Sequence, residues 1–300
     1  MTRFVLSTMY AQTARFDDGA EFARFAQDAG YDAIEISHST PAEKIEAIHA
    51  ANILPIASVH QPAPLRQVGG RPNSNLNLAA IDEDERKLAV FHTLDSIRLA
   101  GEVGADAVIV HLGHLGGTSR AWAGDREARR LFAAGTPHRE AAGRALAVRL
   151  ADAPPYLEAA RKTLAELVEV ASLLGVTLGL ESRLNLPEFP LPLELPALVD
   201  GYTPEQVGYW HDVGHAEVLW RMGYIDRFDW FREPGVRCAG AHVHDVTQLT
   251  DHRAPGAGDV ELAEHARHLS GLDAVTLEIN QHQPEEQVRM TIPLLKSLGF

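Results

Sequence analysis

The sequence predicts a single-domain (β/α)8 TIM barrel over residues 1–300, an α/β fold in which eight parallel strands alternate with helices. Short apolar runs alternate with helix-like stretches along the chain, glycines stand at the junctions, and six of the runs finish on a side chain that can bind a metal. Eight such pairs favour a closed barrel over an open, doubly wound sheet. An arginine-rich helical insertion is expected at about 114–155, after the fourth strand.

The individual elements follow from apolar periodicity and from glycine. The segments AGYDAIEIS, VGADAVIVH and LGVTLGLE share one order: a helix, then Gly30, Gly104 or Gly175, then a turn and a strand. Glycine adopts the left-handed conformation that ends helices. The predicted helices are 18–29, 41–51, 82–103, 156–174, 214–222, 259–268 and 284–298. The predicted strands are FVLSTM (4–9), the run at 33–37, and PIASVH, DAVIVH, VTLGLE, VGYWHD, CAGAH and AVTLE.

The last six runs carry the functional signal, because each ends on a side chain that can bind a divalent metal. These side chains are His60, His111, Glu181, Asp212, His242 and Glu278. Parallel strands that close into a barrel bring matching ends to one point in space. Imidazole and carboxylate groups gathered there form a metal site, which indicates an enzyme.

Alternation along the strands supports this arrangement. Positions two residues before each candidate ligand are often small or polar, whereas the opposite parity holds residues such as Val59, Val110 and Leu180. One face of a barrel strand meets the interior and the other meets the helices, so the apolar set is predicted to face outward. Ile34 and Ile36 on the second strand follow the rule, with Glu35 inward. His211 is the exception, at a helix-facing position.

Composition narrows the class of protein. The net charge of −14 argues against a large basic surface for nucleic acid, and a single cysteine, Cys238, excludes a disulfide framework. The start of the chain has no apolar run long enough for a signal peptide, and no stretch approaches the roughly 20 apolar residues of a membrane span. We therefore expect a soluble cytoplasmic protein with a small-molecule substrate. Outer barrel helices often pair, so a homo-oligomer is compatible with the sequence.

Several motifs together resemble the xylose isomerase-like barrels, a superfamily that includes sugar and sugar-phosphate isomerases and epimerases, inosose dehydratases and the endonuclease IV class. The motifs are LGLESR (178–183), GYWHDVGHAEV (208–218), GAHVHDV (240–246), DHRAPGAGDVEL (251–262) and TLEIN (276–280). The resemblance implies a shared metal site at Glu181, Asp212, His242 and Glu278. It matches His60 and His111 to the extra ligands of members with several metals, and His215 to a ligand or substrate contact. His60 and His111 are equally compatible with substrate contacts.

The same resemblance implies proton transfer next to a carbonyl, through an enediolate that Zn²⁺, Mn²⁺, Mg²⁺ or Co²⁺ stabilises. Glu181 and Glu278 would act as the acid and base, with His215 and Arg183 orienting substrate oxygens. Further substrate contacts are expected from Glu35, His60, His111, His244, His252 and Arg253. The leading hypothesis is a sugar or sugar-phosphate isomerase or epimerase. An inosose-type dehydratase, an abasic-site endonuclease and a sugar-binding protein without turnover remain alternatives.

Other features stay open. In the endonuclease IV class an Asp-x-His motif holds a third zinc, whereas this chain has Asp251 directly before His252, which puts that site in doubt. The GHLGGT stretch (113–118) is either an anion-binding turn or a flexible loop. The Arg-rich segment at 120–149 is either a lid or a solvated insertion. We assign no role to a group of histidines expected on the surface or on helices: His38, His49, His92, His138, His265, His268 and His282.

Overall fold

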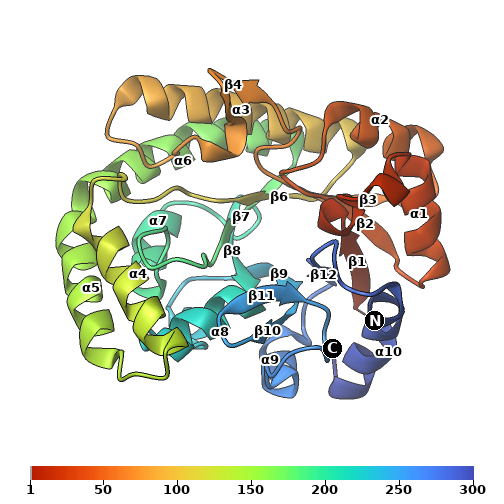
Figure 1. The fold of residues 1–300 in the computed structure, drawn as a ribbon. Coiled ribbons are helices and arrows are strands. Elements are labelled where there is room, and N and C mark those ends of the chain that lie inside the picture. Colours follow the sequence, from red (N-terminus) through yellow and green to blue (C-terminus); the bar gives the residue numbers. More distant parts are fainter. Residues whose placement is uncertain (1) are drawn as a thin grey trace.

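A computed structural model describes residues 2–300 and contains a closed barrel of parallel strands (Figure 1). Around the barrel the strands follow the order β1-β12-β9-β8-β7-β6-β3-β2. Their bounds are β1 Arg3–Ser7, β2 Ala33–Ile36, β3 Ile56–His60, β6 Ala107–Val110, β7 Thr177–Glu181, β8 Val207–Asp212, β9 Cys238–Val243 and β12 Ala274–Leu277. The structure therefore confirms the predicted (β/α)8 barrel.

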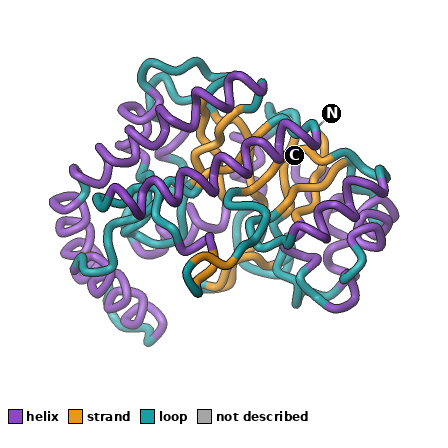
Figure 2. Tube along the Cα trace, turned by 90° about the horizontal axis from the view of Figure 1, so that it is seen from above, coloured by secondary structure: helices purple, strands orange, loops and turns teal. Residues whose placement is uncertain are grey.

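Helices surround this barrel, and Figure 2 shows them around the strands when the molecule is seen from above. They are α1 Gly19–Asp28, α2 Ala42–Ala51, α3 Glu83–Val103, α4 Arg120–Ala133, α5 Arg139–Asp152, α6 Pro154–Leu174, α7 Leu195–Val199, α8 Val213–Met222, α9 Leu262–Leu269 and α10 Glu285–Leu298. Gly104 and Gly175 end α3 and α6 with φ of 74° and 68°, as the junction pattern predicted. In the described part of the chain, we find no helix long and apolar enough to cross a membrane.

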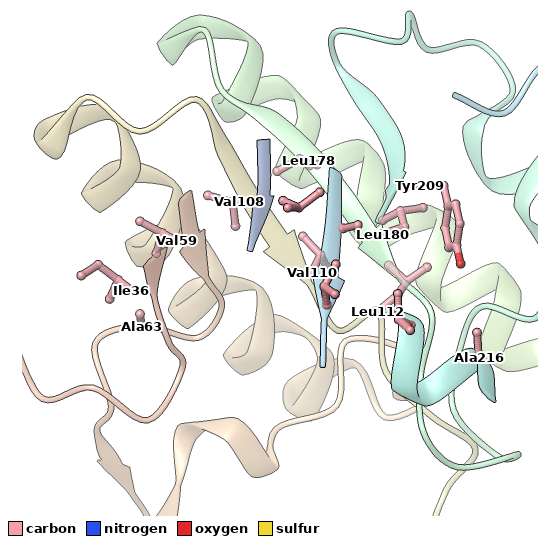
Figure 3. Close-up of a cluster of buried hydrophobic side chains, with 14 of the residues drawn as sticks. Ile36, Val59, Ala63, Val108, Val110, Leu112, Leu178, Leu180, Tyr209 and Ala216 are labelled. Atoms are coloured by element: carbon pink, nitrogen blue, oxygen red, sulfur yellow. The ribbon is translucent and has the colours of Figure 1, made fainter. Parts of the chain in front are cut away.

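The predicted alternation also holds. Ile36, Val59, Val110 and Leu180 are fully buried and belong to the cluster between strands and helices shown in Figure 3. His211 faces this layer as predicted, and its Nε2 lies 3.3 Å from Nδ1 of a residue on α9, His265. His265, expected on the surface or on a helix, lies on α9 and is buried in the same layer.

Inside the barrel, the indole ring of Trp210 fills the space beneath the candidate ligands. Trp210 is paired in register with Gly240 on β9, and its ring lies against Gly179 on β7 as well. A Cβ atom at Gly240 would lie 2.1 Å from the ring, closer than any real contact. The absence of a side chain at Gly240 thus leaves space for the indole ring. The centroid of that ring lies 5.5 Å from the ring centroid of His242.

Replacing Gly240 with alanine is expected to lower the free energy of unfolding by about 1–3 kcal/mol, since the new methyl group overpacks the interior against Trp210. Urea denaturation would measure the change. Gly143→Ala serves as the control, because Gly143 is an exposed helical residue with open space around its Cβ position and should gain roughly 0.5–1 kcal/mol. Equal behaviour of the two variants would contradict a tightly held indole.

Between β6 and β7 the chain forms α4 and α5, which pack side by side at one edge of the molecule (Figure 1). This is the predicted arginine-rich insertion. Arg149 of α5 is fully buried and forms a bidentate ion pair with Glu194, and its guanidinium lies 4.5 Å from the ring centroid of Phe189. Arg149 is therefore part of neither a lid nor a solvated face, because its buried side chain joins the insertion to the segment after β7.

Two short hairpins were not predicted from the sequence. One consists of β4 Gln67–Val68 and β5 Arg71–Pro72, and the other of β10 Asp245–Thr247 and β11 Thr250–Arg253. The second hairpin follows β9 and carries Asp251 and His252. Short 3₁₀ turns complete the structure: η1 Thr8–Ala11, η2 Ala14–Phe16, η3 Asn73–Asn75, η4 Pro192–Glu194 and η5 Asp229–Arg232.

Candidate metal centre

Four of the predicted ligands meet at the carboxyl ends of neighbouring strands. Glu181, Asp212, His242 and Glu278 are all buried, and one ligand-type atom from each lies within 4.8 Å of the corresponding atoms of the others. The order of the strands explains the meeting, because β7, β8, β9 and β12 are adjacent in the barrel and each contributes its last residue or a direct neighbour of that residue.

A second group of candidate ligands shares Glu181 with the first. One ligand-type atom from each of His60, His111 and Glu181 also lies within 4.8 Å of the other two. The distance from Glu181 Oε2 is 2.7 Å to Nε2 of His111 and 3.7 Å to Nε2 of His60. The two histidines therefore lie where a second cation could share Glu181 with the first.

A third group forms where the hairpin β10–β11 meets α8. It combines Asp212, His215, His244 and His252, again with ligand-type atoms within 4.8 Å. Asp251 Oδ2 lies 3.5 Å from Nε2 of His215 and 3.3 Å from Nδ1 of His252. The displaced motif thus still brings Asp251 to this group. His252 has a φ of 53°, in the left-handed region. This bend in the strand accompanies the approach of the Asp251 and His252 side chains to the third group.

Charged and hydroxyl side chains surround these groups. Arg183 donates to Glu181 and to His111, and its Nη2 lies 3.3 Å from Oε1 of Glu188. On the opposite side, Ser58 Oγ donates to Glu35 Oε2 at 2.8 Å, while Nε2 of His242 lies 3.2 Å from the carboxylate. Glu181, His111 and His242 therefore each contact a supporting side chain next to the cluster.

The electrostatics keep the carboxyl groups ionised. Burial acts to raise the pKa of Glu181, but Arg183 and His111 outweigh it and hold the pKa well below its usual value. Burial opposes ionisation of Asp212 in the same way, and His215 and His244 lower the pKa of that carboxyl. The result is a cluster of buried negative charge.

The pKa of His242 moves the other way. Burial alone would lower the pKa, but the carboxylates of Glu278 and Glu35 hold it well above the usual value of histidine. The imidazole stands between these acids, with Nδ1 2.7 Å from Oε1 of Glu181 and 3.3 Å from Oε2 of Glu278. Without a metal, a proton on His242 supplies positive charge at the centre of the cluster, and a metal bound there would displace that proton.

This donor set fits a divalent metal. Glu35, Glu181, Asp212 and Glu278 bring four buried carboxylates together, whereas Arg183 contributes a single guanidinium. Buried carboxylates without enough positive charge are costly, and a divalent cation at the centre would supply it. Mixed nitrogen and oxygen ligands suit zinc, manganese, cobalt and magnesium.

A cavity of about 290 Å³ opens above the cluster. Glu181, Arg183 and Glu278 lie on its wall, together with four histidines of the predicted site: His60, His111, His215 and His252. A cavity of similar size, about 310 Å³, lies at the opposite end of the barrel between residues such as Arg3, Asp106 and Cys238. The first one contains the candidate ligands, and the carboxyl ends of barrel strands are where such folds place their active sites.

Three residues expected to contact substrate lie away from this cavity wall. Glu35 is fully buried beside His242, and His244 is fully buried behind Asp212. Arg253 turns into its own loop, where its Nε donates to the carbonyl oxygen of Ala257 at 2.9 Å. These three residues differ from the expectation for one physical reason: each polar group already contacts another residue of the protein.

His38, expected on the surface or on a helix and given no role, lines the cavity instead. Its ring centroid lies 5.1 Å from that of His60 and 5.6 Å from that of His111. Burial and the nearby His60 lower the pKa of His38 to about 3, so its imidazole is neutral near pH 7. The sequence held a signal for this position of His38. The residue follows β2 by two residues, at the same end of the barrel as the candidate ligands. Ser74 and Asn75, which also line the cavity, had no such signal.

Comparison with known proteins agrees with this fold. The profile of one family, the xylose isomerase-like TIM barrel, matches residues 23–298. An uncharacterized protein of Methanocaldococcus jannaschii is 25% identical over 213 residues, which cover 68% of this chain and 60% of that protein. The chain therefore matches less than two thirds of the length of that relative.

Two solved structures are similar over nearly their whole length. A D-tagatose 3-epimerase-like protein superposes with a TM-score of 0.66 at 20% identity, covering 99% of this chain and 97% of that one. An L-ribulose 3-epimerase gives a TM-score of 0.68 at 18% identity, covering 100% and 94%. With the family profile spanning most of the sequence, the chain belongs to the xylose isomerase-like TIM barrel family.

Proposed function

We propose that this protein is a divalent-metal-dependent isomerase or epimerase of a sugar or sugar phosphate. The observation that carries the proposal is the placement of two carboxylates, Glu181 and Glu278, on the wall of one cavity, each with an oxygen close to His242 Nδ1. Epimerases among the structurally similar proteins support the same reaction class. The cavity of about 290 Å³ lies at the lower end of the roughly 300–1,000 Å³ of small-molecule sites, which suits a small substrate.

Glu181, Asp212, His242 and Glu278 would hold the metal. When bound, a divalent ion polarises a carbonyl oxygen and stabilises the negative charge that develops on it. The protein's own part is proton transfer: one group, as the carboxylate, removes the proton from the carbon next to the carbonyl, and the other, after taking up a proton from solvent, returns it as the carboxylic acid to the opposite face. Glu181 and Glu278 are the two carboxylates on the cavity wall, and we assign them these roles.

Neighbouring side chains would orient the substrate. Arg183 and His215 line the cavity and carry N–H groups suited to hydroxyl or phosphate oxygens. The neutral imidazole of His38 can donate from one nitrogen and accept at the other, which suits a sugar hydroxyl. Met9 and Leu184 add apolar wall that excludes water.

The test is hydrogen exchange at carbon. Protein loaded with Mn²⁺ and incubated in D₂O with a broad panel of ketoses, polyols and their phosphates should place deuterium on a carbon next to a carbonyl. A chelator should stop the exchange, and Asp212→Asn should not show it. A dehydratase would instead release water from the substrate after the same first step. If no substrate in the panel gains deuterium or loses water, the proposal is contradicted.

A second candidate is a metal-dependent endonuclease acting at abasic sites. The observation in its favour is that further candidate ligands adjoin the first four residues, among them His60, His111, His215 and His252. The net charge of −14 opposes binding to nucleic acid. Two or three metals per chain by elemental analysis, with chelator-sensitive cleavage of an abasic duplex, would favour this candidate over the isomerase.

A further inference from the structure

His244 makes two hydrogen bonds that link a candidate metal ligand to the hairpin β10–β11. The residue directly follows β9 and is fully buried. Its Nε2 lies 2.9 Å from Oδ1 and 3.1 Å from Oδ2 of Asp212. Its Nδ1 lies 2.8 Å from the backbone nitrogen of His252 in β11. One imidazole therefore bridges the end of β8 and the hairpin.

The chemistry of these partners sets the tautomer of His244. A backbone N–H can only donate, so Nδ1 accepts the hydrogen bond from His252. The hydrogen of the neutral ring is then on Nε2, where it donates to the Asp212 carboxylate. Both nitrogens are occupied in this arrangement, so His244 supports Asp212 without itself offering a lone pair to a metal.

The same contact fixes the direction of the Asp212 carboxylate. Oδ1 accepts a second hydrogen bond, from the backbone N–H of His215 at 2.7 Å, because Asp212 caps the start of α8. Oδ2 is the oxygen nearer the cluster, 3.7 Å from Nδ1 of His242. His244 contacts both oxygens of Asp212, and the additional backbone donor on Oδ1 leaves Oδ2 as the oxygen that faces the cluster.

Close packing holds the imidazole in place. A Cβ atom at Gly214, in the first turn of α8, would lie 2.0 Å from Cε1 of His244, so the ring lies directly against this glycine. The hairpin in turn carries His252, whose Nε2 lies 3.3 Å from Oε2 of Glu278, and Asp251, which reaches His215. Any movement of His244 would therefore displace both the carboxylate and part of the cavity wall.

We propose that His244 is a positioning residue that makes metal binding at Asp212 and the ordering of hairpin β10–β11 depend on each other. The inference rests on the proposed function only in taking Asp212 as a metal ligand. Coupling between two sites is reciprocal, so a metal that restrains Asp212 should restrain the hairpin through His244, and a loosened hairpin should weaken metal binding. Supporting residues of this kind typically change metal affinity by about 10- to 100-fold.

Two substitutions separate this role from direct ligation. In His244→Leu the ring is replaced by a side chain that makes no hydrogen bond, so the affinity for Mn²⁺, measured by titration calorimetry, should fall about 10- to 100-fold. In His244→Gln an amide N–H can still donate to Asp212, but an amide nitrogen does not bind a metal. His244→Gln should therefore lose clearly less affinity than His244→Leu. His92→Leu, at a buried helical position elsewhere, controls for loss of a histidine as such.

Hydrogen exchange of the amides at 250–253 gives a second readout, independent of catalysis. Mn²⁺ should slow this exchange in the unmodified protein and in His244→Gln, and should leave it unchanged in His244→Leu. Equal loss of affinity in the leucine and glutamine variants would show direct ligation and overturn the proposal, as would a leucine variant with unchanged affinity and unchanged coupling. A protein that binds Mn²⁺ but moves no proton would contradict the proposed reaction alone. A protein that binds no Mn²⁺ would overturn both.

Discussion

Replacing Glu278 with glutamine is expected to lower kcat/KM for proton exchange by about 10²- to 10⁴-fold, the contribution of a positioned acid or base. Glutamine keeps the size of the side chain but cannot accept a proton from carbon. The carboxylate of Glu278 also lies in the ligand cluster, so some loss of metal is expected in addition. Deuterium incorporation and elemental analysis should be measured on the same sample.

Excess Mn²⁺ distinguishes the two effects. If Glu278 transfers protons, saturating metal should restore metal content without restoring exchange, whereas full recovery would show that the residue serves only as a ligand. Glu217→Gln is the matched control, because Glu217 is a buried carboxylate that pairs with Arg221 and Arg227 outside the cavity. That variant should retain the rate of exchange and lose only stability.

Replacing Arg149 with methionine is expected to lower the free energy of unfolding by about 3–5 kcal/mol, since removal of one partner leaves a buried charge unpaired. Methionine roughly preserves the length of the side chain, so the loss reports mainly on charge and hydrogen bonds. Glu194 would keep a buried carboxylate without its bidentate partner, and Arg149 also donates to the carbonyl oxygen of Glu188 at 3.2 Å. Urea denaturation gives the measurement.

Two further variants make the interpretation specific. Arg144→Met, five residues before on the same helix, removes an exposed arginine that pairs with Glu140 and should cost less than about 1 kcal/mol. The double variant Arg149→Met with Glu194→Leu should recover much of the stability, because neither charge then remains buried alone. A double variant that is less stable than Arg149→Met would show that Glu194 stabilises the fold without the arginine, through the hydrogen bond it accepts from the backbone N–H of Leu191.

The strand ends could be predicted because each follows from local pattern. Glu181, Asp212 and His242 stand at the ends of apolar runs, and closure of the barrel then places them together without further information. Outward residues such as Val59 and Leu180 were predictable for the same reason, since alternation along a strand fixes their face. The positions of the ligands and of the outward-facing residues thus follow from neighbouring residues in the sequence and from the symmetry of the barrel.

The contacts that the sequence did not reveal depend on segments that are distant along the chain. β11 is the short polar run TDHR, which has no apolar alternation by which to recognise a strand. His244 and His252 therefore looked like separate substrate contacts, although one supports Asp212 and bonds the backbone of the other. The burial of Arg149 could not be predicted either, because it requires α5 to fold against residues 186–194.

The indole of Trp210 closes the barrel just below His242. On the other side of the cluster, the cavity wall includes Asn75, Leu184 and His252, which belong to three separate segments between barrel strands. Changes in those segments could alter which molecules enter the cavity, while the candidate ligands at the strand ends stay the same. The residues that would select the substrate thus lie in different stretches of sequence from the residues that would react with it. These stretches can diverge at different rates.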